Sequence, residues 1–274
     1  MPGGIAHRFI TLLTDFGLED DFAGICRGVM KRIAPDVEVI DITHGIEPQA
    51  VLQGALVLAN TLPYMPSGVH VAVVDPGVGG GRKALCLRGG DGRLYVGPDN
   101  GVLLVAAEKL GGVQQAVELQ NEEYMLSPVS RTFHGRDVFS PAAAHLALGV
   151  PPEELGPAVP ATALRRLELP RPEIGESRLR ATVLYVDRFG NVQLNLTAGD
   201  LERAGIEPGT EVEIEVAFER YFAIVALTFA DVRGGDIILY EDSYRNVALA
   251  INGGNAAEMF GARPGQQLRI SRLR

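Results

Sequence analysis

The chain is poor in residues that carry redox or metal chemistry. Its 274 residues include two cysteines, no tryptophan and only 6% aromatic residues. Cys26 and Cys86 lie far apart in sequence, and neither has a CxxC partner or the spacing of a metal-ligand motif. We therefore expect two buried free thiols in a reducing cytoplasm.

Positive charge and long apolar runs are also scarce. Lys and Arg number 25 against 34 Asp and Glu, for a formal net charge of −9. This balance argues against nucleic acid or an anionic membrane as the main partner. No apolar run approaches the roughly 20 residues of a membrane-spanning helix, and the first residues lack the pattern of a signal peptide. The sequence predicts a cytoplasmic protein.

The chain does contain regularly alternating apolar segments in its first 150 residues. Three segments have the composition of buried strands: 8–15, 37–43 and 68–75. Residues 83–100 have the pattern of a hairpin that turns across Gly89–Gly92. Four segments have helical spacing: 20–35, 48–65, 101–112 and 135–149. Strands that alternate with helices predict an α/β domain built on a mostly parallel, layered sheet.

The composition changes after residue 150. A proline-rich, charged stretch resembles a linker, and short alternating strands follow it without a convincing long helix. We expect a smaller all-β domain, built as a barrel or a compact sandwich. The predicted boundaries are 1–160 for the α/β domain, 161–177 for the linker and 178–274 for the C-terminal β domain.

The stretch DPGVGGGRK, residues 75–83, follows the third predicted strand. It lacks GxxxxGK[ST] and leads into a strand, whereas phosphate loops need a helix N-terminus behind them. Two readings remain. Asp75 and Arg82 could form a surface ion pair worth under about 1 kcal/mol. Alternatively, Asp75 could lie at the carboxyl edge of a parallel sheet, where open α/β folds bind ligands.

Other polar residues follow predicted strands or precede predicted helices. Asp15, Asp20 and Asp21 come after the first strand. They could bind a metal, a ribose diol, or an ammonium or sulfonium group; Asp20 and Asp21 could instead cap the next helix. His134 precedes a helix, with Gly135 leaving space beside it, and a structural role competes with a functional one.

The segment DRFGN places Asp187, Phe189 and Asn191 on a tight turn of the β domain. An asparagine amide both donates and accepts hydrogen bonds, which suits an adenine edge, and a phenylalanine ring can stack on a base. Taken alone, the segment is equally an ordinary turn.

Eight segments in one order give the chain a more specific signature. They are TLLTDFGLEDDFAG, VIDITHGI, VVDPGVGGGR, YVGPDNG, FHGRDVFSPAAAHLA, DRFGNVQLN, TFAD and NGGNAAE. Together they resemble the S-adenosyl-L-methionine (SAM) hydroxide adenosyltransferases, or SAM hydrolases, which are related to the fluorinase and chlorinase. The resemblance implies an α/β N-terminal domain, a C-terminal β-barrel, and a homotrimer whose site lies between one subunit's N-terminal domain and a neighbour's barrel.

The resemblance also implies a water-activating set of Asp75, Arg82 and His134. The fluorinase has a tyrosine in place of Asp75, a halide-binding serine in place of Gly135, and a long insertion after the arginine. These departures favour water over halide as the nucleophile.

Substrate contacts follow from the same matching. Asp15 matches a ligand of the ribose diol, while Asp20 and Asp187 match partners of the methionine ammonium. The remaining matches are a carboxylate contact at Ser243, adenine contacts at Phe189, Asn191 and Phe229, and a backbone contact at Gly253. A fluorinase arginine beside the methionine is Tyr244 here.

The resemblance therefore implies hydrolysis of SAM to adenosine and L-methionine, by attack of water on the ribose C5′. SAM is the substrate, so we expect no further cofactor and no metal. Two alternatives remain: a halide-using SAM lyase that forms 5′-halo-adenosine, and a non-catalytic trimer that binds SAM or adenosine.

Overall fold

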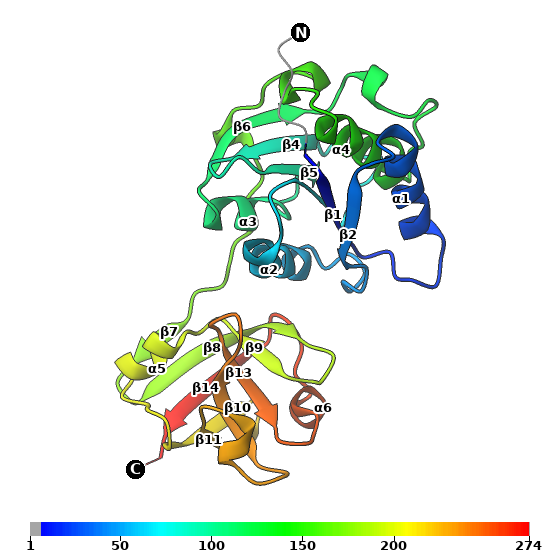
Figure 1. Ribbon diagram of the computed structural model, residues 1–274. Coiled ribbons are helices and arrows are strands. Elements are labelled where there is room, and N and C mark those ends of the chain that lie inside the picture. The colour runs from blue at the N-terminus through cyan, green and yellow to red at the C-terminus, as the bar shows by residue number, and fades with distance from the viewer. Residues whose placement is uncertain (1–6, 274) are drawn as a thin grey trace. The chain divides into compact units, whose positions relative to one another are not determined.

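The computed structural model describes residues 7–273. The chain divides into two compact units, Met1–Leu167 and Glu168–Arg274 (Figure 1). Each unit has its own hydrophobic core, and each is described here by itself.

The first unit is built on a six-stranded sheet. Its strands, in spatial order, are β2 (Glu38–Thr43), β1 (Phe9–Thr14), β3 (Val69–Val73), β5 (Leu94–Pro98), β4 (Ala84–Gly89) and β6 (Val113–Glu118). The pairs β1–β2, β1–β3 and β3–β5 are parallel, whereas β4 runs antiparallel to both of its neighbours. The predicted α/β class, the mostly parallel sheet and the hairpin are confirmed. Strand β6 was not predicted, because two glutamines interrupt its apolar pattern.

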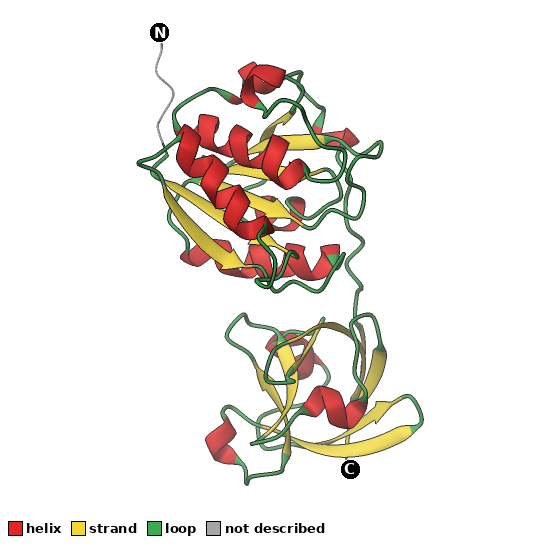
Figure 2. Cartoon of the chain, turned by 90° about the vertical axis from the view of Figure 1, so that its right-hand side faces the viewer, coloured by secondary structure: helices red, strands yellow, loops and turns green. Residues whose placement is uncertain are grey.

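Helices cover both faces of this sheet (Figure 2). The core on one face combines α1 (Phe22–Ile33) and α4 (Ser140–Ala147) with strand residues such as Ile10 and Val71. The core on the other face combines α2 (Val51–Thr61) and α3 (Leu104–Lys109) with Leu13 and Ala72. Side chains alternate across a strand, so a strand buried on both faces reads as one continuous apolar run.

Three predicted helices differ from the structure at their starts, and one of them, 101–112, begins only at Leu104; the other two differ as follows. The first, 48–65, begins only at Val51, since Gln49 has a left-handed backbone with φ +66° that a right-handed helix excludes. The second, 135–149, begins as a π-helical turn, Gly135–Phe139, before α4 continues it. Short 3₁₀ turns lie at Leu62–Tyr64, Glu122–Tyr124, Pro152–Leu155, Ala161–Ala163 and Phe229–Asp231.

The second unit is a closed seven-stranded β-barrel, as predicted. Its strands are β8 (Arg178–Val186), β9 (Val192–Leu194), β10 (Glu211–Val216), β11 (Glu219–Val225), β12 (Ile237–Glu241), β13 (Val247–Ile251) and β14 (Gln267–Arg272). The barrel closes because β14 pairs with both β10 and β8. An eighth strand, β7 (Glu173–Gly175), adds to β8 from within the predicted linker. Two short helices, α5 (Ala198–Arg203) and α6 (Ala256–Phe260), complete the unit.

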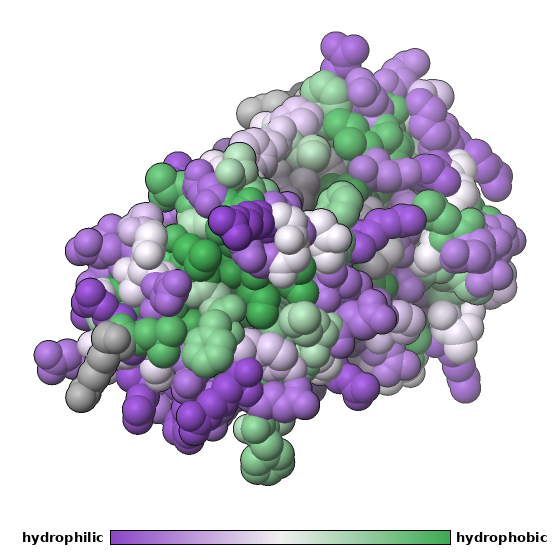
Figure 3. Space-filling view, turned by 90° about the horizontal axis from the view of Figure 1, so that it is seen from below, coloured by the Kyte–Doolittle hydropathy of each residue, from purple (hydrophilic) through white to green (hydrophobic). Residues whose placement is uncertain are grey.

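Alternation along the barrel strands separates core from surface. On β8, Leu179 and Ala181 join the barrel core while Arg178 and Arg180 lie outside it. The face in Figure 3 shows charged and apolar side chains intermixed. Among the described residues, no helix is both long and apolar enough to cross a membrane.

The two cysteines are buried, free thiols of the first unit. Burial raises the pKa of Cys26 to about 11 and that of Cys86 to about 12. Their thiolates are therefore suppressed at neutral pH, which gives them the low reactivity of structural cysteines.

Candidate functional site

The carboxyl ends of β1 and β3 place two acids side by side in one pocket. Asp15 directly follows β1, and Asp75 lies two residues beyond the end of β3, its parallel neighbour. Both line a pocket of about 200 Å³ together with Gln49 and His134. The remaining lining residues are Phe16, Val73, Pro76, Val78, Thr132, Phe133 and Gly135. The edge of the parallel sheet is thus where these polar groups gather, as in other open α/β folds.

Asp75 and Arg82 form a buried, multiply hydrogen-bonded ion pair. The Arg82 Nη2 donates to Asp75 Oδ2 at 2.5 Å, and its Nε lies 3.0 Å from both carboxylate oxygens. The two side chains are only 5% and 6% exposed. The alternative of a surface ion pair is therefore wrong, because both side chains are almost completely shielded from solvent.

His134 extends this pair into a three-residue network. The Arg82 Nη2 also lies 2.8 Å from His134 Nδ1. A guanidinium can only donate, so Nδ1 accepts and the proton of a neutral imidazole resides on Nε2. Burial and, secondarily, the Arg82 charge lower the pKa of His134. The neutral imidazole is thus the favoured form at this site.

The glycine-rich loop lets the chain fold back so that Arg82 meets Asp75. Gly79 has φ +72°, and a Cβ there would lie 2.1 Å from the Arg131 carbonyl oxygen. A Cβ at Gly77 would lie 3.2 Å from Arg82 Cγ. The Arg82 guanidinium is 5.3 Å from the centre of the Phe139 ring. The loop therefore needs its glycines for close packing, and nothing in its position resembles a phosphate loop.

Asp15 is held by a strained backbone segment. The Gln49 N–H donates to Asp15 Oδ2 at 2.8 Å, from the residue that has φ +66°. Burial raises the pKa of Asp15 and the nearby charge of Asp75 adds to that shift, while the Gln49 hydrogen bond opposes it. Left-handed, non-glycine residues cluster at functional sites. Gln49 was not singled out in the sequence, because no local motif marks a positive φ at glutamine.

Asp20 and Asp21 lie apart from this pocket. Both are exposed and neither is among its lining residues. Asp21 occupies the N-cap position of α1 but its side chain makes no capping hydrogen bond. The capping expectation is wrong for Asp21. Within residues 7–273, no group of three or more His, Cys, Asp or Glu side chains has an arrangement that could hold a metal ion.

A second pocket, of about 720 Å³, lies on the barrel unit. It brings together six residues that the resemblance implicates: Asp187, Phe189, Asn191, Phe229, Ser243 and Gly253. Tyr244 also lines it. Further lining residues were missed in the sequence, among them Tyr185, Gln193, Tyr240 and Asp242. The first three lie on β8, β9 and β12, and Asp242 directly follows β12, so the pairing of these strands brings the four residues together.

Two turns of the same design border this pocket. Residues 187–191 read DRFGN and residues 242–246 read DSYRN. In both, the first and last residues pair through backbone hydrogen bonds, and the fourth has positive φ, +80° at Gly190 and +69° at Arg245. The repeated pattern D-x-[FY]-x-N is a sequence signal that could have identified Asp242.

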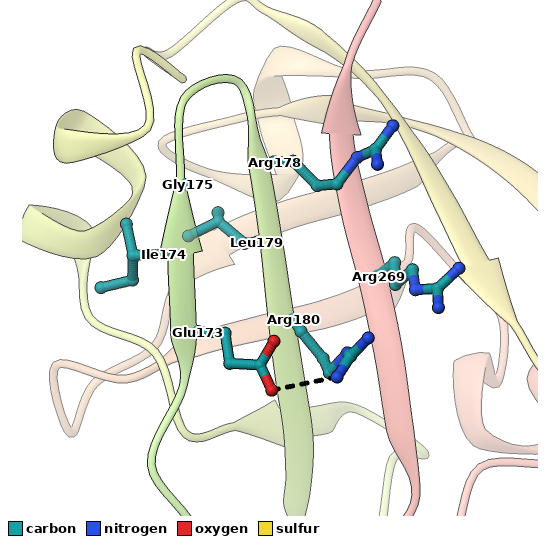
Figure 4. Close-up of a pocket in the computed structure, with 7 residues that line it drawn as sticks. All are labelled: Glu173, Ile174, Gly175, Arg178, Leu179, Arg180 and Arg269. Atoms are coloured by element: carbon teal, nitrogen blue, oxygen red, sulfur yellow. Dashed lines mark hydrogen bonds and ion pairs between the residues drawn. The ribbon is translucent and has the colours of Figure 1, made fainter.

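Another hollow on the barrel contains none of the predicted site residues. It measures about 390 Å³ and is lined by Glu173, Ile174, Gly175, Arg178, Leu179, Arg180 and Arg269. Figure 4 shows Glu173 and Arg180 paired across β7 and β8. Their side chains are 68% and 38% exposed, which is typical of a solvated surface pair.

The chain is similar to known proteins over most of its length. The family model of the SAM hydroxide adenosyltransferase N-terminal domain matches residues 10–156, and that of the C-terminal domain matches residues 181–269. A crystal structure of an uncharacterized conserved protein from Thermotoga maritima superposes with a TM-score of 0.89 at 36% identity, covering 96% of this chain and 100% of that chain.

The curated relatives are named for two different activities. A protein from Salinispora tropica named (R)-S-adenosyl-L-methionine hydrolase is 49% identical over 265 residues, 96% of this chain and 97% of that protein. A Thermus thermophilus protein of the same name is 39% identical, covering 96% and 99%. A fluorinase from Actinopolyspora mzabensis is 27% identical, covering 99% and 100%. The chain therefore belongs to the SAM hydroxide adenosyltransferase family.

Proposed function

We propose that this chain is an enzyme that hydrolyses SAM to adenosine and L-methionine. Support comes from its family membership and from relatives named SAM hydrolase at 39–49% identity over most of the chain. The observation that carries the mechanism is the buried Asp75–Arg82–His134 network at the edge of the sheet.

The reaction is an in-line displacement at the ribose C5′. The water oxygen forms a bond to C5′ while the C5′–S bond breaks. The electron pair of the broken bond stays on sulfur, so methionine leaves as a neutral thioether. One proton of the water must be removed. The sulfonium is already an activated leaving group, so the protein's task is to orient, desolvate and deprotonate water.

Asp75 is the group we assign as proton acceptor. His134 Nδ1 is occupied by Arg82, which leaves Nε2–H as a donor toward the water oxygen. Arg82 stays charged and fixes both partners. Orientation of this kind supplies about 7–11 kcal/mol in favourable cases, and a positioned base adds roughly 10²–10⁴-fold in rate.

The substrate contacts are proposed as follows. Asp15 accepts hydrogen bonds from the ribose diol, with its Oδ2 already steadied by the Gln49 N–H. Asn191 and Gly253 contact the adenine, and Phe189 and Phe229 stack against it. Ser243 contacts the methionine carboxylate, and Asp187 and Asp20 contact the ammonium. The enzyme needs no further cofactor.

The position of Gly135 supports water over halide as the nucleophile. A Cβ at Gly135 would lie 3.1 Å from Phe16 Cζ and 3.4 Å from Phe133 Cε2. A serine there would require the Phe16 ring to shift by a few tenths of an ångström, and Asp75 would repel a nearby anion. Two like charges 4 Å apart cost about 4 kcal/mol at an effective dielectric near 20.

We further propose that the enzyme is a cytoplasmic homotrimer that shares each site between subunits, with no nucleic-acid or membrane partner. Exposed aromatic residues of the barrel unit, Phe189, Phe218 and Phe222, support an assembly, because exposed apolar groups often mark contact surfaces. Mixing two inactive variants, Asp15→Ala and Asn191→Ala, should regenerate some complete sites. No recovery after verified subunit exchange would show that each chain carries a whole site.

Incubating the purified protein with SAM in isotopically labelled water tests the reaction itself. We expect adenosine labelled at the 5′-hydroxyl together with L-methionine, detected by mass spectrometry. A 5′-halo-adenosine formed in the presence of chloride would instead identify a halide-using lyase. Binding of SAM without any product would identify a non-catalytic SAM-binding protein.

A further inference from the structure

The barrel pocket is acidic and has no cation among the described residues that line it. Asp187 and Asp242 both line it, whereas its other lining residues are neutral. The two arginines of the bordering turns, Arg188 and Arg245, are not among the lining residues. Arg245 is 86% exposed at its side chain and pairs with Glu241 at 2.7 Å. A ligand in this pocket therefore meets fixed negative charge.

The two carboxylates are held in equivalent ways. Asp187 Oδ1 accepts the backbone N–H groups of Phe189 and Asn191 at 2.8 and 2.9 Å. Asp242 Oδ1 accepts those of Tyr244 and Asn246 at 2.8 and 3.0 Å. This arrangement fixes both charges at the border of the pocket and leaves them little freedom to turn away from a ligand.

A side-chain amide secures the second oxygen of each carboxylate. Asn191 Nδ2 donates to Asp187 Oδ2 at 2.8 Å, and Gln193 Nε2 donates to Asp242 Oδ2 at 2.6 Å. Each amide nitrogen uses one of its two N–H groups on a carboxylate, so the carbonyl oxygen and one N–H of each amide remain for a ligand. Carboxylates and amide carbonyls are acceptors, so this wall suits N–H donors and cations.

Two tyrosines that line this pocket have pKa values raised partly by these carboxylates. Burial raises the pKa of Tyr185, and the charge of Asp187 adds to the shift. Burial likewise raises the pKa of Tyr240 to about 12, with further contributions from Asp187 and Asp242. Tyr240 lies opposite Ala248, which in turn lies opposite Gln193 in the strand register. The strand register therefore places Tyr240 and Gln193, the hydrogen-bond partner of Asp242, on the same stretch of the pocket wall.

From this charge pattern we infer a further activity: the chain also hydrolyses S-adenosyl sulfonium compounds that carry an amine but no carboxylate. The inference rests on the proposed SAM hydrolysis and extends its substrate class. SAM carries a sulfonium, an ammonium and a carboxylate; loss of the carboxylate removes the one group that the acidic pocket repels. Water bonds to C5′, the electron pair of the broken C5′–S bond stays on sulfur so that a neutral thioether amine leaves, and Asp75 takes the water proton, giving adenosine.

Three substrates assayed in parallel test this inference through kcat/KM for adenosine release. They are SAM, its decarboxylated aminopropyl form, and a deaminated form that keeps the carboxylate. We expect the decarboxylated form to match SAM within threefold or to exceed it, and the deaminated form to fall at least 30-fold below. A decarboxylated form more than 30-fold poorer than SAM, or a deaminated form equal to SAM, would overturn the inference.

Substitutions at Tyr244 provide a matched control. This side chain is 45% exposed and belongs to the turn that carries Asp242. Tyr244→Arg adds the missing cation, so it should raise the preference for SAM over the decarboxylated form at least tenfold. Tyr244→Phe should leave that preference unchanged. An unchanged preference in Tyr244→Arg, with folding verified by circular dichroism, would contradict the electrostatic reasoning.

The two proposals fail in different ways. Turnover of SAM without turnover of the decarboxylated form would reject only the further activity. Absence of adenosine from every substrate, with binding retained, would reject the proposed hydrolysis itself.

Discussion

Replacing Asp75 by asparagine tests the buried network most directly. The substitution keeps the shape of the side chain but removes the charge that faces Arg82 through three hydrogen bonds. The Arg82 guanidinium, 6% exposed at its side chain, then remains buried without a carboxylate. The substitution should lower both kcat and the free energy of unfolding, for reasons that can be separated.

The two losses have different expected sizes. Removing one partner of a buried ion pair costs about 3–5 kcal/mol of unfolding free energy. The amide oxygen of the new asparagine can still accept a hydrogen bond from Arg82, so we expect Asp75→Asn to lie at the lower end of this range. A cost of about 3 kcal/mol lowers Tm by roughly 6–12 °C for a unit of this size. Loss of the base should lower kcat by about 10²–10⁴-fold while SAM still binds.

A second variant separates catalysis from stability. In the double variant Asp75→Asn with Arg82→Met, no unpaired charge remains, so Tm should recover most of the loss. Its kcat should stay as low as that of Asp75→Asn. Glu173→Gln is the matched control: it breaks the exposed pair with Arg180 at 3.0 Å and should cost at most about 1 kcal/mol without changing kcat.

The measurements are steady-state adenosine release, SAM binding by calorimetry and thermal unfolding, on the same four preparations. Near-wild-type kcat in Asp75→Asn would remove Asp75 from the mechanism. Recovery of kcat together with Tm in the double variant would equally refute it, since activity would then follow stability and not the carboxylate.

Four further predictions concern His134, Gly135 and the sulfonium leaving group. The lowered pKa of His134 keeps its imidazole neutral even somewhat below pH 6.5, the ordinary pKa of histidine. We therefore expect kcat/KM to stay constant from pH 8 to 6.5 and to fall only in more acid solution. A fall that begins above pH 7 would contradict this. In the folded state this site resists protonation, so its contribution to the free energy of unfolding should decrease as pH falls below 6.5. In urea titrations His134→Gln should make the total decrease smaller; the remainder comes from His7, His70 and His145, whose pKa values are also lowered. Gly135→Ser should lower kcat/KM at least tenfold without creating a chlorinated product, because the new Cβ would lie 3.1 Å from Phe16 Cζ. Unchanged turnover would show that the Phe16 ring moves aside freely. Exhaustive chelation should leave adenosine release unchanged, since a sulfonium leaves without electrophilic help, and a loss restored by added metal would disprove that reasoning.

The order of elements could be read from the sequence because local signals agreed with the final fold. Apolar runs that end in acids marked β1 and β3, and Gly89–Gly92 marked the hairpin of β4 and β5. The change to short alternating segments marked the smaller β domain, without deciding between a barrel and a compact sandwich. The DRFGN turn was placed correctly, since aspartate, glycine and asparagine at those positions favour one tight turn.

Other features depended on contacts between distant residues. A spacing of seven residues allows Asp75 and Arg82 to meet, but only the packing of the loop against Arg131 and Phe139 decides that the pair is buried. The left-handed backbone of Gln49 likewise has no local sequence signature, because contacts with the surrounding structure stabilise it.

The sequence patterns by themselves therefore determined an α/β part followed by a smaller β part, and the position of the acids at strand ends; the resemblance of the chain's ordered motifs to a known family added the barrel. Composition, periodicity and turn chemistry act over a few residues, so a single sequence reveals them. Only the tertiary structure decided which side chains share a pocket. Gln193 and Asp242 stand 49 positions apart yet hydrogen-bond at 2.6 Å, because the register of β9 against β13 and of β13 against β12 sets their distance. That register is a property of the closed barrel, and no local pattern encodes it.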